Sequence, residues 1–537
     1  MIGSARRSLG FVFLLSMLLA LSAAAAPAGL ARGETSTRVA GINVDATTIP
    51  ELQELMDAHR LTSVQLVQFY LHRIKKLNST LNAVITVNPT ALAEARAADR
   101  ARRQGDDRPL LGIPIIVKDN INTTGMATTA GSWALAGSTP SDAFIVERLE
   151  AAGAIVLAKA NLSEWANFRS SPSSSGWSGI GGQTNMAYVL DRNPCGSSSG
   201  SGVVASADLA VAAVGTETDG SIVCPSGANA VVGIKPTVGL LSREGIVPIS
   251  AEQDTAGPMA RNVTDAAVLL GAMTGIDTAD PATADQAGNA FADYTQFLDG
   301  NALVGARIGV WREGSGFGVD GDVDAIMEAT IAALDAAGAV IVDPVAVEIE
   351  EAYEPEFAAL LCEFKTDIAG YLQTYTDAGY PKTLADLIEF NEDNPDLEGP
   401  WNSLIFELAE ETNGRDEDCA DVRELANEIA RASIDDTMAE HDLDAIIAPT
   451  NGPAWLTDPI NGDLGGDFSL FIGSSSPAAI AGYANITVPA GYVDEHLPIG
   501  VSFMAGRWDE PMLISLAFAF EQATQIRQPP QFLPTLN

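Results

Sequence analysis

Short apolar runs alternate with amphipathic helical patterns along most of this 537-residue chain. Residues 142–165, DAFIVERLEAAGAIVLAKANLSEW, predict a helix, a glycine turn and a buried strand. Residues 304–345 predict a strand, a helix and a strand, and residues 442–450 predict another strand. Because strands that alternate with helices pair into a sheet covered by those helices, we predict an α/β fold: a single large mixed β-sheet flanked by helices on both faces.

Composition supports one large domain and excludes some partners. Hydrophobic residues make up 47% of the chain and charged residues 19%, which is typical of a globular protein with a large core. The 70 acidic and 30 basic residues give a formal net charge of −40. Such a surface repels phosphate backbones and anionic lipid, so we expect no nucleic-acid partner and no binding to membrane surfaces. The acidity is typical of a soluble protein in salty or extracellular surroundings.

The N-terminus has the pattern of an export signal. Arg6 and Arg7 precede an apolar run over 9–26, and small residues ending at Ala28 fit a cleavage site. The alternative is an uncleaved anchor, but the run is short for a spanning helix and ends in alanines. We therefore expect a secreted or periplasmic protein that is free of the membrane after cleavage. The predicted division is a signal peptide at 1–28 and one domain at 29–537.

The four cysteines give little sign of metal or dithiol chemistry. Cys195, Cys224, Cys362 and Cys419 form no C-x-x-C pair and no cluster with histidine. Export permits a disulfide, and Cys362 with Cys419 is one conceivable pair. The sequence alone leaves the pairing open.

A segment dense in serine and glycine, 170–202, precedes the next apolar pattern. Taken alone, such a composition is typical of a flexible linker. Trp177 and Tyr188 oppose that interpretation, because linkers rarely carry large aromatic residues. The segment also continues into an apolar helix pattern, a strand and a glycine turn, where glycine lets the backbone approach a ligand closely. We therefore expect a functional loop here.

Two serine-based interpretations compete in this region. Residues 196–200, GSSSG, match the G-x-S-x-G elbow of α/β-hydrolase-type esterases, with Ser198 at the centre. That elbow needs a strand directly before it, and the preceding DRNPC is a poor strand. It also needs a histidine, and only His441 and His496 lie outside the N-terminal helical patterns. The elbow interpretation is therefore the weaker one.

Lys118 is a candidate base of another kind. It ends the apolar run at 111–120, LGIPIIVKDN, which predicts a buried strand. Burial disfavours an ammonium ion and lowers the lysine pKa, and a neutral lysine can activate a serine. The alternative for Lys118 alone is a surface or ion-paired lysine, with Asp119 as a neighbour.

Three segments together resemble the amidase signature family: GIPIIVKDNI, CGSSSGSG and GTETDGSIVCPS, in that order and spacing. The resemblance extends over nearly the whole chain after the signal. It implies the amidase signature fold, a catalytic domain over 29–537 and a Ser–cis-Ser–Lys triad. By this resemblance Ser221 is the nucleophile, Ser197 the middle serine after a cis peptide bond, and Lys118 the base. The implied supporting residues are Ser199 and Thr216 around the lysine, and the backbone N–H groups of Thr218, Asp219 and Gly220 as the oxyanion hole.

The sequence also departs from the common family pattern. Val223 and Cys224 stand where family members that act on carboxylate-bearing substrates place arginine, and an aspartate replaces a usual glycine. A substrate carboxylate beside the nucleophile would lack a partner, which disfavours glutamyl-tRNA amidotransferase and malonamidase functions. The variant turn and NLSEWANFRSS resemble the peptide amidases. That resemblance implies hydrolysis of C-terminal peptide amides and contact of Asn167 with the substrate backbone; the alternative for Asn167 is a polar residue at a helix end.

We therefore predict a monomeric amidase that hydrolyses neutral small-molecule or peptide amides with release of ammonia, and that needs no cofactor and no metal. One alternative is a fatty-acid amide or aryl-acylamide hydrolase of the same fold, which would need an apolar channel. Another is an α/β-hydrolase-type esterase. A third is a non-catalytic binding protein that keeps the fold; such a protein would be expected to lose Lys118, Ser197 or Ser221, and all three are present.

Overall fold

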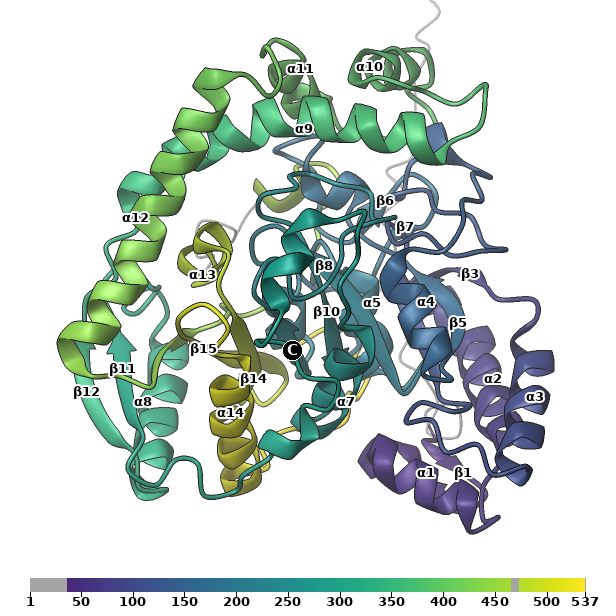
Figure 1. Cartoon of the computed structure of the whole chain (residues 1–537), viewed down its shortest axis with the longest axis vertical. Coiled ribbons are helices and arrows are strands. Elements are labelled where there is room, and N and C mark those ends of the chain that lie inside the picture. The colour runs from purple at the N-terminus through teal and green to yellow at the C-terminus, as the bar shows by residue number, and fades with distance from the viewer. Residues whose placement is uncertain (1–35, 465–472, 537) are drawn as a thin grey trace, which may run out of the picture.

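The computed structural model describes residues 36–464 and 473–536 (Figure 1). The predicted signal peptide at 1–28 lies outside these residues. A single 11-stranded mixed sheet runs through the described domain, in the order β12-β11-β13-β15-β14-β9-β10-β8-β4-β5-β3. Its strands are β3 (Val84–Val87), β4 (Pro114–Lys118), β5 (Ile155–Ala160), β8 (Ala212–Glu217), β9 (Val232–Lys235), β10 (Thr255–Ala260), β11 (Arg307–Trp311), β12 (Val340–Val345), β13 (Ala445–Pro449), β14 (Asn485–Val493) and β15 (Leu497–Met504).

Parallel pairing occurs in two parts of this sheet. Strands β8, β4 and β5 are parallel, and so are β12, β11 and β13. The pairs between these parts, from β8 through β10, β9, β14 and β15 to β13, are antiparallel. Edge strand β3 is antiparallel to β5. Two short pairs lie outside the main sheet: β1 (Arg38–Val39) with β2 (Ile42–Asn43), and β6 (Trp177–Ser178) with β7 (Gly182–Gln183).

Helices cover both faces of the sheet, which confirms the predicted fold class. Alternate residues of β13 show this, because Ile447 packs in the main core whereas Ile446 packs in a second core with Ile434. The helices are α1 (Ile49–Asp57), α2 (Ser63–Leu81), α3 (Ala91–Arg103), α4 (Phe144–Ala151), α5 (Ser199–Ser206), α6 (Val223–Ala228), α7 (Val263–Met273), α8 (Gly321–Ala336), α9 (Tyr353–Tyr375), α10 (Leu384–Asp393), α11 (Leu404–Glu410), α12 (Glu417–His441), α13 (Ser476–Ala481) and α14 (Glu510–Thr524).

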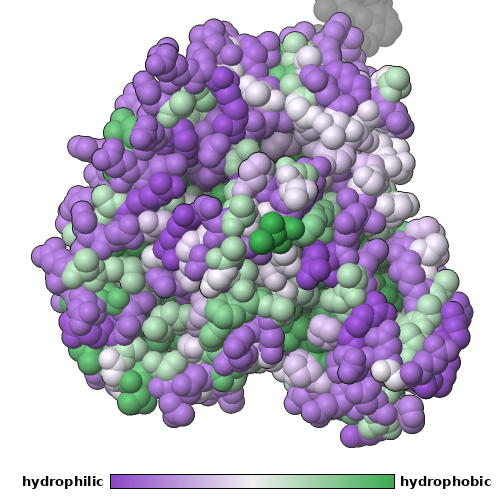
Figure 2. Space-filling view, viewed as in Figure 1, coloured by the Kyte–Doolittle hydropathy of each residue, from purple (hydrophilic) through white to green (hydrophobic). Residues whose placement is uncertain are grey.

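Helices α9, α10 and α11 lie across one end of the molecule, and α12 runs down the side that carries β11 and β12 (Figure 1). The view in Figure 2 shows a largely hydrophilic surface with small scattered apolar patches, as the acidic composition predicts. Within the described ranges, no helix combines the length and apolar character that crossing a bilayer requires.

Two disulfides are present in the described residues. Cys362 of α9 is bonded to Cys419 of α12, the pair that the sequence left open. Cys195 is bonded to Cys224, a pair that the sequence did not suggest. The first ties two helices at the end of the molecule. The second ties the loop before Ser197 to α6, which begins two residues after Ser221.

Candidate active site

Two neighbouring parallel strands bring the predicted site residues together. β4 ends at Lys118 and β8 ends at Glu217, and Val117 pairs with Val214 in their ladder. Because parallel strands end at the same edge of a sheet, Lys118 lies beside the last residues of β8 and the turn that follows. All five residues of β4 are buried, as the apolar run predicted.

The side chains of Lys118, Ser197 and Ser221 form one continuous hydrogen-bonded chain. Lys118 Nζ lies 2.8 Å from Ser197 Oγ, and Ser197 Oγ lies 2.9 Å from Ser221 Oγ. The relative exposure falls from 8% at Ser221 to 1% at Ser197 and 0% at Lys118. The Gly196–Ser197 peptide bond is cis, as the family resemblance implied. A proton can therefore pass from the cavity-facing serine to a fully buried amine.

The environment of Lys118 favours its neutral form. Thr216 accepts from Lys118 Nζ through its hydroxyl at 2.9 Å and its carbonyl at 3.2 Å, so it occupies the place predicted for it. Asn120 Nδ2 donates to the same hydroxyl at 3.0 Å and fixes it, a role that the sequence did not suggest. Burial lowers the pKa of Lys118 to about 7, against the opposing fields of Asp254 and Glu217. A neutral amine can donate to the two Thr216 oxygens and accept the proton of Ser197.

Ser199 does not join this network, which differs from the expectation. It is the first residue of α5, and its hydroxyl donates to the carbonyl of Cys195 at 2.6 Å. The acceptor lies four residues earlier, in the loop that precedes α5. Ser199 therefore holds the loop before Ser197 and has no hydrogen bond to Lys118.

The turn before Ser221 offers a different set of oxyanion donors from the one expected. Gly220 N–H donates to the carboxylate of Glu217 at 3.0 Å, so it is not free to bind an oxyanion. Within the described ranges, the N–H groups of Thr218, Asp219 and Ser221 have no hydrogen-bond acceptor. Of the three residues expected to supply oxyanion donors, Thr218 and Asp219 therefore have free N–H groups, whereas the N–H of Gly220 is already bonded to Glu217.

The carboxylate of Glu217 binds three backbone N–H groups in and after this turn. Besides Gly220, its carboxylate accepts from the N–H groups of Ile222 at 2.7 Å and Val223 at 3.0 Å, at the start of α6. Gly220 itself has φ +73°, a left-handed conformation that favours glycine. The carboxylate and the glycine together fold the chain tightly around Ser221. Burial raises the pKa of Glu217, and the backbone N–H groups of Val223 and Ile222 act against that rise.

Ser221 opens into a cavity of about 400 Å³. Asn167 lines it, and so does the Cys195–Cys224 disulfide. The described lining contains no lysine, arginine or histidine, and it is rich in hydroxyl groups: Ser170, Ser171, Ser173, Ser175, Ser475 and Ser476.

Two arginines close to the cavity in sequence, Arg169 and Arg192, bind other groups of the protein. Arg169 is 3% exposed and pairs with Glu164 at 2.7 Å and Glu398 at 3.4 Å. Arg192 donates to the carbonyl of Ala454 at 3.2 Å and lines a different cavity. Neither guanidinium therefore supplies a cation to the cavity that holds Ser221.

The geometry of Ser198 disfavours the elbow interpretation. Its hydroxyl donates to the carbonyl of Thr216 at 3.0 Å and accepts from the Thr216 N–H at 3.2 Å, which bonds the loop to β8. Ser198 is fully buried, and no strand leads directly into it, since the preceding strand β7 ends at Gln183. His441 ends α12 and His496 lies in the turn between β14 and β15, so neither lines the cavity.

Comparisons with known proteins agree with this geometry. A family model described as Amidase matches residues 65–514. The X-ray structure of native peptide amidase from Stenotrophomonas maltophilia is 48% identical, with a TM-score of 0.84, and the match covers 91% of this chain and 99% of that chain. A protein of Arabidopsis thaliana described as a probable amidase is 41% identical over 506 residues, which is 91% of this chain and 92% of that protein. A glutamyl-tRNA(Gln) amidotransferase component of Halorhodospira halophila is 32% identical over 489 residues, which is 89% of this chain and 97% of that protein.

Proposed function

Because this chain belongs to the amidase signature family and is a serine amidohydrolase, we propose that it removes ammonia from peptides whose C-terminus is a carboxamide. The proposed catalytic residues are Ser221, Ser197 and Lys118. The observation that carries the substrate assignment is the described lining of the Ser221 cavity, which offers many neutral hydroxyl groups and no cation.

Acylation begins with the transfer of two protons along the serine relay. Neutral Lys118 takes the proton of Ser197, Ser197 takes the proton of Ser221, and the Ser221 oxygen attacks the amide carbonyl. The new bond joins Ser221 Oγ to the carbonyl carbon, and the carbonyl electron pair moves to the oxygen. The proposed donors to that oxyanion are the N–H groups of Thr218, Asp219 and Ser221, which have no acceptor among the described residues.

Collapse of the tetrahedral intermediate needs a proton on the leaving nitrogen. Ser197 supplies it and regains a proton from Lys118, so ammonia leaves and Ser221 carries the acyl group. Water then attacks the acyl-enzyme, with the same relay accepting its proton, and Ser221 is released with the carboxylic acid product. Each proton taken by Lys118 is returned within a cycle.

The cavity favours a peptide over a fatty amide. The serine hydroxyl oxygens and the Asn167 amide can accept from the N–H groups of a peptide backbone, although Ser170, Ser173, Ser475 and Ser476 already donate to acceptors within the protein. A lining of such polar groups fits a peptide backbone better than an alkyl chain, which offers no hydrogen-bonding groups. Ile249, Leu360 and Trp455 supply apolar contact for a side chain. The similarity to the Stenotrophomonas maltophilia peptide amidase supports the same substrate class.

An adjoining cavity favours a second candidate, an amide with a bulky apolar group. It measures about 650 Å³, is lined in part by Val247, Pro248 and Tyr371, and shares Thr218 and Ile249 with the first cavity. An aryl-acylamide substrate could occupy it.

The deciding experiment measures kcat/KM for an N-blocked dipeptide amide, a long-chain fatty amide and an anilide. The peptide amide should be the best substrate, and a higher value for either of the others would replace the peptide assignment.

Activity should depend on pH through Lys118. The base must be neutral, and its pKa is about 7, so protonation below that pH should lower kcat/KM about tenfold per pH unit. The value should level off above pH 7. The measurement is kcat/KM for an uncharged peptide amide between pH 5 and 9 at constant ionic strength. A limb with an apparent pKa near that of free lysine, about 10.4, would contradict a desolvated base.

We also propose that the protein is exported, as its N-terminal sequence predicts, and that it acts as a monomer. The mature chain should begin near Ala28, because a signal peptidase cuts after small residues. N-terminal sequencing of protein recovered outside the cytoplasm tests the cleavage. Exported material that still begins with the segment containing Arg6 and Arg7 would indicate an anchor.

A further inference from the structure

The turn that precedes Ser221, residues 218–221, is hydrogen-bonded by two residues, Gln253 and Asp254, that take no part in the proposed proton transfers. Gln253 and Asp254 immediately precede β10, whose first residue, Thr255, pairs with Glu217 at the end of β8. Continued past the strand ends, that antiparallel register places Asp254 opposite Thr218 and Gln253 opposite Asp219. Gln253 is fully buried and Asp254 is 8% exposed.

Both residues contact Thr218, at two different points. Gln253 Nε2 donates to the carbonyl of Thr218 at 3.0 Å. The hydroxyl of Thr218 donates to Asp254 Oδ1 at 2.5 Å, while Asp254 Oδ2 accepts from the N–H groups of Ile249 and Ser250. The backbone and the side chain of Thr218 are therefore each fixed by one neighbour.

The contact with the Thr218 carbonyl determines where the next N–H points. The carbonyl of Thr218 and the N–H of Asp219 belong to one planar peptide group. A donor that fixes the carbonyl oxygen therefore fixes the direction of the Asp219 N–H on the opposite side. It also polarises that N–H, since hydrogen bonds in a chain strengthen one another. The Asp219 side chain is fixed as well, by the hydroxyls of Ser475 and Ser476.

Gln253 is itself held in one orientation. Its Oε1 accepts from Arg423 Nη1 at 2.7 Å, and its Nε2 also donates to Glu356 at 2.7 Å. Because the guanidinium has no acceptor, the amide oxygen must face Arg423 and the amide nitrogen must face Thr218. Arg423 forms a two-point ion pair with Glu363, at 2.8 and 2.6 Å.

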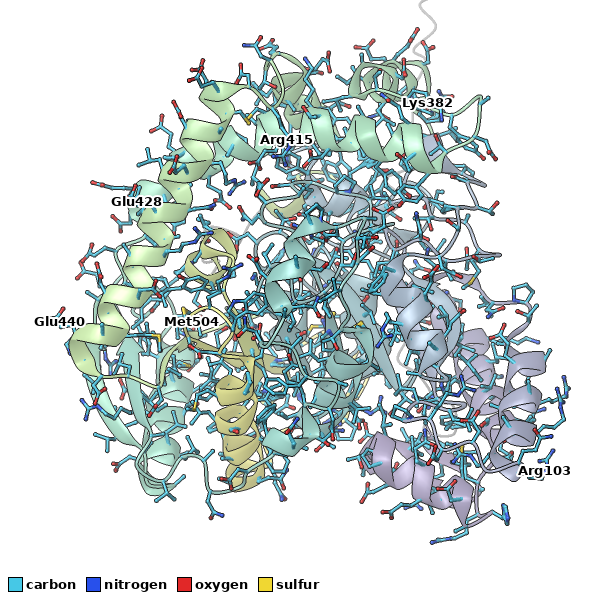
Figure 3. All side chains as sticks on the ribbon, in the orientation of Figure 1. Arg103, Lys382, Arg415, Glu428, Glu440 and Met504 are labelled. Carbon is cyan, nitrogen blue, oxygen red and sulfur yellow. A yellow bond between two sulfur atoms is a disulfide. The ribbon has the colours of Figure 1, made fainter. Side chains whose placement is uncertain are left out.

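This arrangement connects the turn to the helix pair α9 and α12. Glu363 lies on α9 and Arg423 on α12, beside the disulfide that joins Cys362 to Cys419. Arg415, labelled in Figure 3 beside α9, adds an ion pair to Asp367 at 2.7 Å. A continuous chain of hydrogen bonds therefore runs from Glu363 and Arg423 of the two helices through Gln253 to the carbonyl of Thr218.

We propose that Gln253 is a positioning residue for the oxyanion hole: it aims the Asp219 N–H at the developing oxyanion, and Asp254 fixes Thr218 beside it. The proposal rests on the proposed function, because it assigns the Asp219 N–H to the oxyanion. It adds a specific residue, remote from the relay of Lys118 and the two serines, on which the rate depends.

The test compares Gln253→Leu with Gln286→Leu. Gln286 is 3% exposed and donates to the carbonyls of Gly239 and Gly275, so its loss removes similar buried bonds away from the site. For an N-blocked dipeptide amide, Gln253→Leu should lower kcat about 10- to 100-fold, less than the full loss of an oxyanion donor, with KM nearly unchanged. Gln286→Leu should lower the melting temperature similarly and keep the wild-type kcat.

Three further measurements separate an effect on oxyanion positioning from an effect on folding. Gln253→Glu keeps an acceptor for Arg423 and removes the donor to Thr218, so kcat should fall here too in a folded protein. Active sites are counted with a fluorophosphonate, so that kcat refers to folded enzyme. Affinity for a peptide aldehyde, whose adduct oxygen occupies the oxyanion position, should fall in proportion to kcat/KM.

The outcomes are distinct. Wild-type kcat in both Gln253 variants, or a loss no larger than that of Gln286→Leu, overturns this proposal while leaving the amidase assignment intact. Full activity of a Ser221→Ala variant would instead remove the proposed mechanism on which this inference rests.

Discussion

Replacement of Ser221 by alanine should abolish amide hydrolysis, with kcat about 10⁶-fold below that of the intact enzyme. The reason is that Ser221 is the cavity-facing end of the hydrogen-bonded chain, and no other hydroxyl in the described structure bonds to Ser197 Oγ. Ser197→Ala and Lys118→Ala should also reduce turnover severely, since each interrupts the same proton path. The losses should not add in a double variant, because residues of one relay act as a unit.

Ser201→Ala is the matched control for this experiment. Ser201 is a buried serine of α5 whose hydroxyl donates to the carbonyl of Val214 at 3.1 Å, and it has no bond to the relay. It should keep most of the activity. The measurement is ammonia release under single-turnover and steady-state conditions, with folding checked by thermal unfolding. If Ser221→Ala stayed active while Ser198→Ala or His496→Ala lost activity, the esterase elbow would be the correct interpretation.

Much of the fold could be predicted from local patterns. The run that ends at Lys118 contains Ile115, Ile116 and Val117, and such a short β-branched apolar run is typical of a strand buried on both faces. The start of α2 is equally local, because Thr62 forms a capping box with Gln65 three residues later. These features depend on neighbours in the sequence, so no tertiary information was needed.

The prediction that Lys118, Ser197 and Ser221 lie close together did not come from local sequence patterns. Lys118, Ser197 and Ser221 are separated by 79 and 24 residues, and no periodicity brings them together. The resemblance of three short segments to one family supplied the expectation. Their contact in the structure then follows from the pairing of β4 with β8 and from the loop before α5.

Other contacts could not be predicted from the sequence, because they depend on the path of buried side chains. A carboxylate at position 217 can face solvent, a cation or its own backbone, and only the closed turn shows that it takes the N–H of Gly220. The serines of the GSSSG run are likewise equivalent in sequence. In the structure the hydroxyl of Ser197 bonds to Lys118, and that of Ser198 bonds to Thr216 of β8. The hydroxyl of Ser199 donates to the carbonyl of Cys195. The Cys195–Cys224 pair required the same three-dimensional information.

Substrate charge should have the second large effect on activity. Neutral peptide amides, such as an N-blocked dipeptide amide, should exceed malonamate or free glutamine at least about a hundredfold in kcat/KM. The physical reason is that a carboxylate near the scissile bond would be buried without a partner, at a cost of about 3–5 kcal/mol. A difference of about 1.4 kcal/mol corresponds to a factor of ten in rate, which gives the stated ratio.

The described cavity strengthens this expectation beyond what the missing arginine suggested. Arg169 is committed to Glu164 and Glu398, and Arg192 lines another cavity, so neither neutralises an incoming carboxylate. Two acidic side chains, Asp219 and Asp463, also belong to the lining. Any negative charge on them adds repulsion to the missing attraction. On the proposed function, the cavity should therefore disfavour glutamine, even though the chain is similar in sequence to a component of glutamyl-tRNA(Gln) amidotransferase.

The experiment compares the two kinds of substrate at one pH and one ionic strength, with ammonia release as the common readout. A useful pair differs only in the charged group: an N-blocked dipeptide amide with a neutral side chain beside the amide, and the same compound with a carboxylate there. Raising the salt concentration should narrow the gap only slightly, because screening acts weakly on buried charges. Equal values for the pair, or a preference for the charged amide, would show that a cation does reach the site and would remove the basis for the peptide-amide assignment.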